Sequence, residues 1–477
     1  MKALVVLLAG AALLAGCGSQ RQAARTLPRA NVRRPAPAPK ALTLPRVKPG
    51  PDRPPAVVHD VQVTVVDGDT NARVRGARVT IGRHTARSDR HGVARVPLAH
   101  RAALVTVAAK IGYDERAVRL PFRTHPRSTM RIFRRSLQWT MYGAGGARTQ
   151  AQTGIHVRPP FRVVWSRGVG GLVEFPAVVS EGVAYVANAK GTVWALDMRN
   201  GRRIWRHDTP HGKMAASPAV WGDELIVHGM DGHVWVLRRG DGRLLWHYTV
   251  GSPVESSPVI VDGADVFGAW SGTVTALDLR THRVRWRRHD GCKITSSAAL
   301  SGGTLYIGDY CGRLLALNAR NGRVRWSGSV DGRVYGTPAV ARGRVFVPSS
   351  TGGSLTAFTT GGRALWRRST GSYVYSSPAV ADGRVFFGSY NGVFYAVSAA
   401  TGATLWSHET GGPISGAAAV VDGVAYAGSF AHRILGVDAR SGRVVLSFPH
   451  GEYVPVSGSG RRLLLHGYSR LYAVVER

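Results

Sequence analysis

Apolar and polar positions alternate in short runs over the last three hundred residues of the chain, and the runs repeat. GTVWALDMRNGRRIWRHDT (191–209) has apolar residues two positions apart, an Asn-Gly turn and a tryptophan, and GHVWVLRRGDGRLLWHYT repeats it in the next unit. Alternation with a period of two, interrupted by Asn-Gly and Asp-Gly pairs, is typical of β-hairpins. The pattern therefore predicts an all-β protein built from one recurring hairpin.

Two markers keep the same period through this region. One is a tryptophan every 40 or 41 residues, with Leu446 in the next place: Trp165, Trp205, Trp246, Trp286, Trp326, Trp366 and Trp406. The other runs through Pro176, Pro218, Pro258, Pro338 and Pro378, with Ala298 and Ala418 at the missing steps. Four short strands per unit at this period predict a β-propeller, in which each blade covers the apolar faces of its neighbours.

The units predict eight blades of four strands. The last unit begins near Val456 and has only three strands before the chain stops, so we expect the strand Phe161–Trp165 to complete it. Seven blades is the alternative, if the final unit docks irregularly. The propeller is expected to be a monomer.

The repeat resembles a known family. GTVWALDMRNGRRIW resembles the pyrroloquinoline-quinone (PQQ) type propeller repeat with its tryptophan-docking motif, and WTMYGAGGART (139–149) resembles the segment that precedes the first blade there. The resemblance covers residues 137–477 and implies that the tryptophans pack between blades. His282 in place of the turn glycine and Leu446 in place of tryptophan depart from the pattern.

A different β pattern fills residues 57–136. VQVTVVD, ARVTIG and LVTVAAK are short alternating runs, which predict a small antiparallel β-sandwich. VRGARVTIGRHTARSDRHGVARVPL resembles the carboxypeptidase regulatory-like (transthyretin-like) family. That resemblance implies an Ig-like accessory or spacer module without catalysis.

The N-terminus predicts a position outside the cytoplasm. MKALVVLLAGAALLAGCGS has one Lys and a short apolar run, as in a signal peptide, and Leu14-Ala15-Gly16-Cys17 resembles the bacterial lipobox. We therefore expect residues 1–17 to be a lipoprotein signal peptide with Cys17 lipidated. Residues 18–56 are rich in Pro and Arg, which predicts a disordered tether. The protein is expected to be anchored to the cell membrane or outer membrane, in the periplasm or at the cell surface.

The charge is strongly basic, with 63 Lys and Arg against 28 Asp and Glu and a formal net charge of +35. Because the protein is expected to lie outside the cytoplasm, binding of nucleic acid does not explain this positive charge. Arg is scattered through strands and turns, which favours solvated surface, and attraction to anionic lipid or a cell-wall polymer is the alternative.

Cys292 and Cys311 are the cysteines that remain after Cys17. In a four-stranded blade the turn between the second and third strands and the link to the next blade lie on one face, and these two cysteines fall in such segments. We expect a disulfide, worth about 3 kcal/mol in the loop-entropy model. No second Cys or His stands at ligand spacing, so no metal site is expected.

The same face is expected to gather aromatic side chains, which suit binding of a protein partner or a sugar. The alternative, that the rings simply cover the turn backbone, stays open. The candidate binding face consists of Trp270, Tyr310, Tyr335, Tyr375, Tyr390, Phe430, Tyr453 and Tyr468, with Tyr373 also in a link.

No catalytic residue and no cofactor is predicted. Quinoprotein dehydrogenases of the resembled family use adjacent cysteines, calcium ligands and an Asp base, whereas the cysteines here are nineteen apart. Few acids fall on the candidate face: Glu255, Asp290, Asp309 and Asp331. A non-catalytic binding or assembly scaffold is favoured, as in the propeller lipoprotein of the outer-membrane β-barrel assembly machinery. A PQQ-dependent dehydrogenase and an extracellular ligand or polysaccharide sensor are the alternatives.

Overall fold

The computed structural model describes residues 59–99, 102–210 and 212–477. The predicted signal peptide, Cys17 and the tether lie outside the described residues. Nearly all regular structure is β, with two single-turn 3₁₀ helices, η1 (Arg135–Leu137) and η2 (Tyr142–Ala144). Within the described ranges, no helix combines the length and apolarity needed to cross a membrane.

The first part of the described chain forms two sheets that face each other. One sheet has the strand order β4-β1-β7 and the other β3-β2-β5-β6. The strands are β1 (His59–Asp67), β2 (Arg78–Ile81), β3 (His84–Arg87), β4 (Val93–Leu98), β5 (Ala103–Ala109), β6 (Arg116–Pro121) and β7 (Arg127–Ile132).

Alternating residues of both sheets supply the core between them. Val61, Val63 and Val65 of β1 are fully buried, and they share a cluster with Val79 and Ile81 of β2. One feature differs from the antiparallel sandwich predicted from sequence: β1 pairs with β7 in parallel. The reason is that no tight turn joins these two strands, which lie at opposite ends of this part, so hairpin geometry does not fix their relative direction.

Among the described residues, 161–477 form eight sets of four antiparallel strands; the first seven are meanders, and the eighth takes its fourth strand from the beginning of the region. From first to fourth strand, the sheets are as follows: β10 (Val178–Ser180), β11 (Val183–Ala187), β12 (Thr192–Asp197), β13 (Arg203–Asp208); β14 (Ala219–Trp221), β15 (Glu224–His228), β16 (His233–Arg238), β17 (Leu244–Thr249); β18 (Val259–Val261), β19 (Ala264–Gly268), β20 (Thr273–Asp278), β21 (Val284–His289); β22 (Ala299–Ser301), β23 (Thr304–Gly308), β24 (Arg313–Asn318), β25 (Val324–Ser329); β26 (Ala339–Ala341), β27 (Arg344–Ser349), β28 (Ser354–Thr359), β29 (Ala364–Ser369); β30 (Ala379–Ala381), β31 (Arg384–Gly388), β32 (Val393–Ser398), β33 (Thr404–Glu409); β34 (Ala419–Val421), β35 (Val424–Ser429), β36 (Arg433–Asp438), β37 (Val444–Pro449); β38 (Gly451–Ser459), β39 (Arg462–Gly467), β40 (Arg470–Glu476), β9 (Phe161–Gly168).

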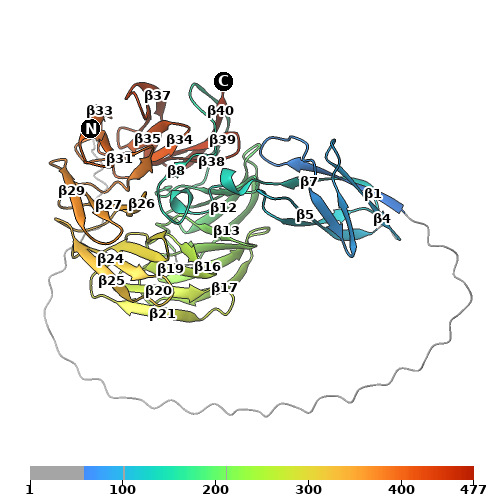
Figure 1. Ribbon diagram of the computed structural model, residues 1–477, viewed down its shortest axis with the longest axis horizontal. Coiled ribbons are helices and arrows are strands. Elements are labelled where there is room, and N and C mark those ends of the chain that lie inside the picture. The colour runs from blue at the N-terminus through green and yellow to red at the C-terminus, as the bar shows by residue number, and fades with distance from the viewer. Residues whose placement is uncertain (1–58, 100–101, 211) are drawn as a thin grey trace, which may run out of the picture. The chain divides into compact units, whose positions relative to one another are not determined.

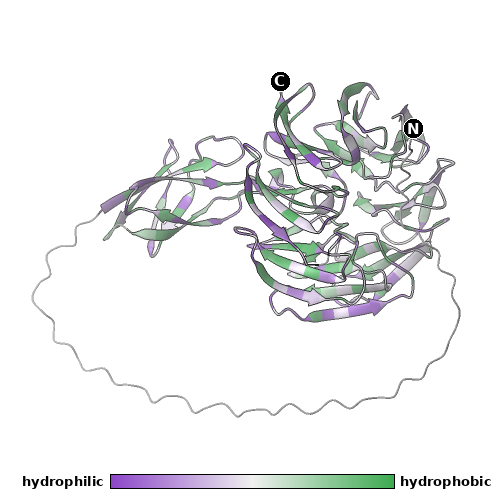
Figure 2. Ribbon diagram, turned by 180° about the vertical axis from the view of Figure 1, so that it is seen from behind, coloured by the Kyte–Doolittle hydropathy of each residue, from purple (hydrophilic) through white to green (hydrophobic). Residues whose placement is uncertain are grey.

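Burial falls from the inner to the outer strands of each sheet. The second and third strands are almost fully buried, whereas the fourth strands alternate between exposed and partly buried residues. Figure 2 shows the same change, with green strands inside and the pale and purple β21 at the outer edge. Short apolar second and third strands therefore form the packed interior, while the fourth strands face solvent.

The eight sheets follow one another around a common centre (Figure 1). Most successive first strands contact one another, as do β38 of the last sheet and β10 of the first. The strand β9 comes from the beginning of this region and pairs antiparallel with β40, which ends near the C-terminus. The N-terminal strand therefore completes the last sheet, as the sequence predicts.

The periodic tryptophans link each sheet to the next one. The Trp366 indole N–H donates to the Ala399 carbonyl at 3.2 Å, and its ring lies against Gly402 of the following sheet. Gly402 has a φ of +75°, and a Cβ there would come within 2.6 Å of the ring. Equivalent indole donations, to residues 33 or 34 positions ahead, are made by Trp165, Trp205, Trp286, Trp326 and Trp406.

Trp246 packs differently, because His282 replaces the turn glycine of the next sheet. The imidazole of His282 stacks on the Trp246 ring with centroids 4.2 Å apart. His282 adopts the left-handed conformation, with φ of +57°, that glycine adopts in the other units. The substitution therefore preserves the turn and replaces the glycine–tryptophan contact by a stacked pair of rings.

Candidate functional site

The turns between second and third strands and the links between sheets lie on one side of the eight sheets, which we call the link face. Backbone hydrogen bonds tie each turn to the preceding link: Tyr310 N–H to Lys293 at 2.9 Å and Tyr390 N–H to Tyr373 at 2.8 Å. The recurring bond places the turn side chain of one sheet beside the link side chains that lead into that sheet. Aromatic residues at these positions are therefore brought together.

Six rings on the link face form a continuous series, which we call the aromatic arc. Tyr335 contacts Tyr375 at 5.6 Å between centroids, Tyr375 contacts Tyr390 at 5.1 Å, and most pairs are edge-to-face. The series extends from Tyr390 to Phe430 at 6.0 Å and from Phe430 to Tyr453 at 5.3 Å. The full arc is Tyr335, Tyr373, Tyr375, Tyr390, Phe430 and Tyr453.

Two further residues of the predicted face lie beside the arc around a lysine. The Lys293 ammonium stands 3.2 Å from the ring centroid of Trp270 and 4.9 Å from that of Tyr310. These distances are within the range of a cation–π interaction. Tyr468 differs from the others: it is 50% exposed and forms no ring contact with another aromatic residue in the described part of the chain.

A small central pocket opens beside the arc. Its lining comes from the links before six sheets, from the start of β38 and from η2, and it contains two carboxylates, Glu174 and Glu255, together with Tyr335, Tyr375 and Tyr453. The pocket has a volume of about 40 Å³. The pocket therefore has room for a group at least the size of a water molecule.

The two carboxylates have different surroundings. Glu255 is 6% exposed and accepts hydrogen bonds from the Trp270 indole at 3.0 Å and from the Tyr335 hydroxyl. Glu174 receives no side-chain donor from the described residues. Burial, and then the negative charge of Glu255, raise the pKa of Glu174 to about 7, while the nearby Lys213 acts in the opposite direction.

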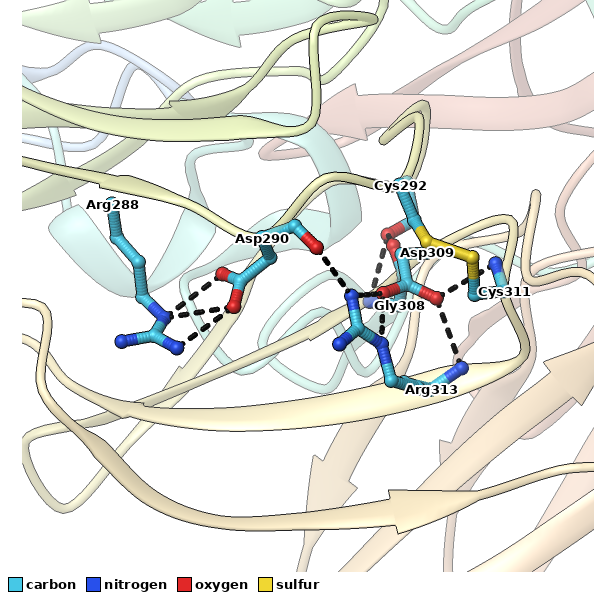
Figure 3. A network of polar contacts seen from close by, with 8 residues as sticks. Arg288, Asp290, Cys292, Gly308, Asp309, Cys311 and Arg313 are labelled. Atoms are coloured by element: carbon cyan, nitrogen blue, oxygen red, sulfur yellow. Dashed lines mark hydrogen bonds and ion pairs between the residues drawn. A yellow bond between two sulfur atoms is a disulfide. The ribbon is translucent and has the colours of Figure 1, made fainter.

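Cys292 and Cys311 are joined in a disulfide on the link face, with Cα atoms 5.9 Å apart (Figure 3). The buried Asp309 lies beneath it and accepts hydrogen bonds from the Cys311 backbone N–H at 2.9 Å and from Arg313 Nε at 2.8 Å. Arg313 also donates to the Asp290 carbonyl at 2.9 Å. The disulfide and this network fix the two loops that carry Lys293 and Tyr310.

The same cysteines and Asp309 place three ligand-type atoms within 4.8 Å of one another. The two sulfur atoms are bonded to each other, and the carboxylate is occupied by Arg313 and by backbone N–H groups. The cluster therefore presents no free thiolate to a metal ion, and the network stabilises the loops instead.

A buried Ser–His–Asp set resembles a hydrolase triad only by composition. His228 Nε2 lies 2.8 Å from the Asp265 carboxylate, and Nδ1 lies 2.6 Å from the backbone carbonyl of Ser256. All three residues are fully buried. Because serine contributes its carbonyl and no solvent reaches the set, this arrangement joins two sheets and cannot deliver a nucleophile.

The lead-in segment, Trp139–Gln152, passes across the inner edges of the sheets, which the sequence did not indicate. Trp139 exchanges backbone hydrogen bonds with Val179 of β10. Backbone carbonyls of the segment also accept from the middle residues of five other first strands: Val220, Leu300, Val340, Val380 and Val420. The short strand β8 (Ala151–Gln152) pairs in parallel with β34.

Arg148 anchors this segment from the inside. It is 1% exposed, and its guanidinium donates to the carbonyls of Ala298 at 2.9 Å and Pro258 at 2.7 Å, and also to Tyr142 and Ser257. Burial lowers its pKa to about 10.

A belt of hydroxyl groups also joins neighbouring sheets near the centre. The backbone N–H of Ser257 donates to Ser297 Oγ at 2.8 Å, and Ser297 N–H donates to Thr337 Oγ1 at 3.1 Å. Ser217 and Thr337 donate in the same way to the hydroxyl forty residues ahead. A sequence signal exists for this belt: each of these residues directly precedes the periodic Pro or Ala.

Comparisons with known proteins bear on the region that builds this face. The family described as outer membrane protein assembly factor BamB matches residues 161–269, 270–370 and 349–453. The chain belongs to this family. Members of it are the relatives found in Yersinia pestis, 30% identical over 135 residues, and in Burkholderia pseudomallei, 33% identical over 121 residues.

These alignments are partial. Each covers 25% of this chain, and 34% and 31% of those two relatives, so the aligned part spans about a third of their length. Quinoprotein ethanol dehydrogenase of Pseudomonas putida is 26% identical over 101 residues, which cover 18% of this chain and 16% of that protein.

Solved structures of two kinds share the fold. BamB from Moraxella catarrhalis aligns with a TM-score of 0.57 at 18% identity, covering 66% of this chain and 98% of that one. Quinohemoprotein alcohol dehydrogenase from Comamonas testosteroni aligns with a TM-score of 0.63 at 14% identity, covering 72% and 81%. At these identities the likeness establishes a propeller of this repeat type and no activity.

Proposed function

We propose that the chain is a membrane-anchored, extracytoplasmic propeller that acts as a non-catalytic binding or assembly scaffold. The observation that carries the proposal is the aromatic arc. It gathers six rings from four sheets on one face, and Tyr373 is 49% exposed there. Tyrosine supplies large contact area at low conformational-entropy cost, which is typical of binding hot spots.

The scaffold in this proposal is a closed ring of eight blades. The pairing of β9 with β40 and the contact of β38 with β10 support closure between the last sheet and the first. A closed ring leaves no apolar sheet face uncovered and holds the loops of the link face in fixed positions.

The remaining domains place the ring at a membrane in this proposal. Residues 1–17 act as the signal peptide and lipobox with Cys17 lipidated, 18–56 as the tether, and 57–136 as a carboxypeptidase regulatory-like spacer before the propeller at 137–477. The relatives are named as outer membrane protein assembly factors, which supports an extracytoplasmic position and a protein partner on the arc. Anionic lipid or a cell-wall polymer remains the second partner class, attracted by the net positive charge.

Site-specific photo-crosslinking tests the scaffold. p-Benzoylphenylalanine in place of Tyr373 places the crosslinker on the arc, and the same residue in place of Leu405 places it on the outer strand β33 at the same exposure, 49%. We expect irradiation of membranes to link one defined protein at position 373 and none at 405.

Adding Tyr390→Ala should abolish the product at position 373, because that ring joins the two halves of the arc. Equal products at both positions, or a product unaffected by Tyr390→Ala, would contradict a partner on this face. Crosslinking to glycan alone would favour the sensor alternative.

A quinone-dependent dehydrogenase is the second candidate, because quinoprotein dehydrogenases are among the relatives. The described residues do not fit that cofactor. Among the described residues the disulfide joins loop residues nineteen apart, not the adjacent cysteines that such enzymes use. After incubation with PQQ and calcium and then dialysis, we expect no bound quinone absorbance; retention of one quinone per chain would overturn this reading.

A further inference from the structure

The central pocket is small, and the carboxylates that line it suit a cation. Its volume is about 40 Å³, enough for a small polar group. Glu174 and Glu255 both line it. An ammonium head group, which is a compact point charge, fits this space.

The walls of the pocket suit a cation. Tyr335, Tyr375 and Tyr453 line it, and their π-faces carry partial negative charge that attracts ammonium groups. Lys293, two residues before the pocket residue Thr295, already makes cation–π interactions with Trp270 and Tyr310.

The two carboxylates are not equally available. Glu255 is fixed by the Trp270 indole and the Tyr335 hydroxyl. Glu174 is partly buried and receives no such donor from any described residue; Lys213 is near enough to act on its charge but donates no hydrogen bond to it.

The rest of the molecule makes this pocket unusual. The chain carries a formal net charge of +35, which repels cations from most of its surface. Saturable binding of a small amine would therefore require a dedicated local site, and nonspecific association is disfavoured.

We propose that the pocket between Glu174 and Glu255, walled by Tyr335, Tyr375 and Tyr453, binds a primary ammonium group. The group is carried by a lysine side chain of the partner on the aromatic arc or by a free amine. The lysine source rests on the proposed scaffold function; the free-amine source does not.

The proposal has a defined pH dependence. The pKa of Glu174 is raised to about 7, so the carboxylate is mostly neutral at pH 6 and mostly ionised at pH 8. The other groups that face it are Glu255, Lys213, Tyr335 and Tyr453; burial raises the pKa of both tyrosines, which stay neutral over this range. Ammonium binding should strengthen as pH rises from 6 to 8.

The test measures binding of Nα-acetyl-lysine methylamide and of cadaverine to the full chain by saturation-transfer NMR. Glu174→Gln removes the charge but keeps the shape, and Glu409→Gln, on an exposed position of β33, changes the net charge equally. Nα-Acetyl-norleucine methylamide is the probe without the ammonium group.

We expect Glu174→Gln to weaken amine binding about tenfold and to remove its pH dependence, with Glu409→Gln within twofold of the wild type. Binding of the norleucine probe equal to the lysine probe, no amine binding at pH 8, or equal losses in both variants would overturn the proposal. Stronger binding of the lysine probe than of cadaverine assigns the site to a partner side chain, and the reverse assigns it to a free amine.

The two proposals fail separately. If crosslinking at position 373 persists but no amine binds, the ammonium site is wrong and the scaffold stands. If amines bind as expected but no partner is crosslinked, the pocket is a small-ligand site and the scaffold is wrong.

Discussion

At the scale of single residues, the recurring contact of a tryptophan with a glycine one sheet ahead holds neighbouring sheets in register. Trp366 packs its ring on Gly402 and donates to a carbonyl of the same turn. The sequence marks this pair through its period, but the direction of the contact, from one unit to the next, depends on how the sheets are stacked.

Replacing that glycine tests how much the tryptophan–glycine contact contributes to the free energy of unfolding. Gly402→Ala adds a methyl group 2.6 Å from the Trp366 ring at a φ of +75°, whereas Gly383→Ala in the same sheet has nearly the same φ, +74°, and nothing within 4 Å. We expect losses of about 3 kcal/mol and about 1 kcal/mol respectively, because overpacking adds to the shared backbone strain only in the first variant. Urea unfolding of both variants measures the difference; equal losses would mean that the ring moves aside without cost.

Glu174 and Glu255 also belong to this scale. Each is a single acid in a link; Glu255 was predicted from sequence as one of a few acids on the face, but it was not paired with Glu174. Their 81-residue separation equals two periods of the repeat, so they hold equivalent positions two units apart, but Ala215 at the position between them is not acidic.

At the scale of elements, the lead-in segment closes the inner edges of six first strands. First strands of three residues would otherwise leave free N–H and C=O groups facing the centre, and unpaired edges of this kind are costly when buried. The segment accepts one hydrogen bond from each of these strands and is fixed by Arg148. WTMYGAGGART could be recognised in the sequence, but its course across the sheets could not, because its partners are backbone groups.

Arg148→Met tests this role. The variant keeps much of the side-chain length but leaves the carbonyls of Pro258 and Ala298 without their donor in a dry environment. We expect a loss of about 3 kcal/mol, compared with less than about 0.5 kcal/mol for Arg320→Met at an exposed turn. Chemical unfolding followed by tryptophan fluorescence measures both, and a loss for Arg148→Met no greater than for the control would show that water replaces the guanidinium.

At the scale of the whole molecule, the last sheet is tied to the first by strand and side-chain contacts. β9 supplies the fourth strand of the last sheet. His466 of β39 is fully buried, and its Nε2 accepts a hydrogen bond from the backbone N–H of Ala177, just before β10, at 3.1 Å. This bond requires the neutral imidazole.

The closure should therefore weaken in acid. Burial lowers the pKa of His466 to about 4, below its ordinary value of 6.5. Between these values the unfolded chain binds the extra proton, so this stabilisation is complete above pH 6.5 and is lost as pH falls to about 4, by about 3 kcal/mol. His466→Gln, whose amide oxygen accepts the same bond without titrating, should show a flatter stability profile between pH 4 and 6.5, measured by urea midpoints. His289→Gln, at an exposed position, should retain the wild-type slope; a wild-type slope in His466→Gln would remove His466 as the cause.

The sequence alone determined the strands, the turns, the repeat and the order of the sheets, because alternation, turn glycines and the tryptophan period are all encoded within one unit of about forty residues. It also placed Cys292 beside Cys311 and most of the aromatic arc on one face, since equivalent positions of successive units lie together. Only the tertiary structure decided three contacts. β1 pairs in parallel with β7, the Arg148 guanidinium binds buried backbone carbonyls, and Glu174 approaches Glu255. These contacts exist only once packing brings distant links and edges to the same place, and neither the alternation nor the period says which of these positions meet.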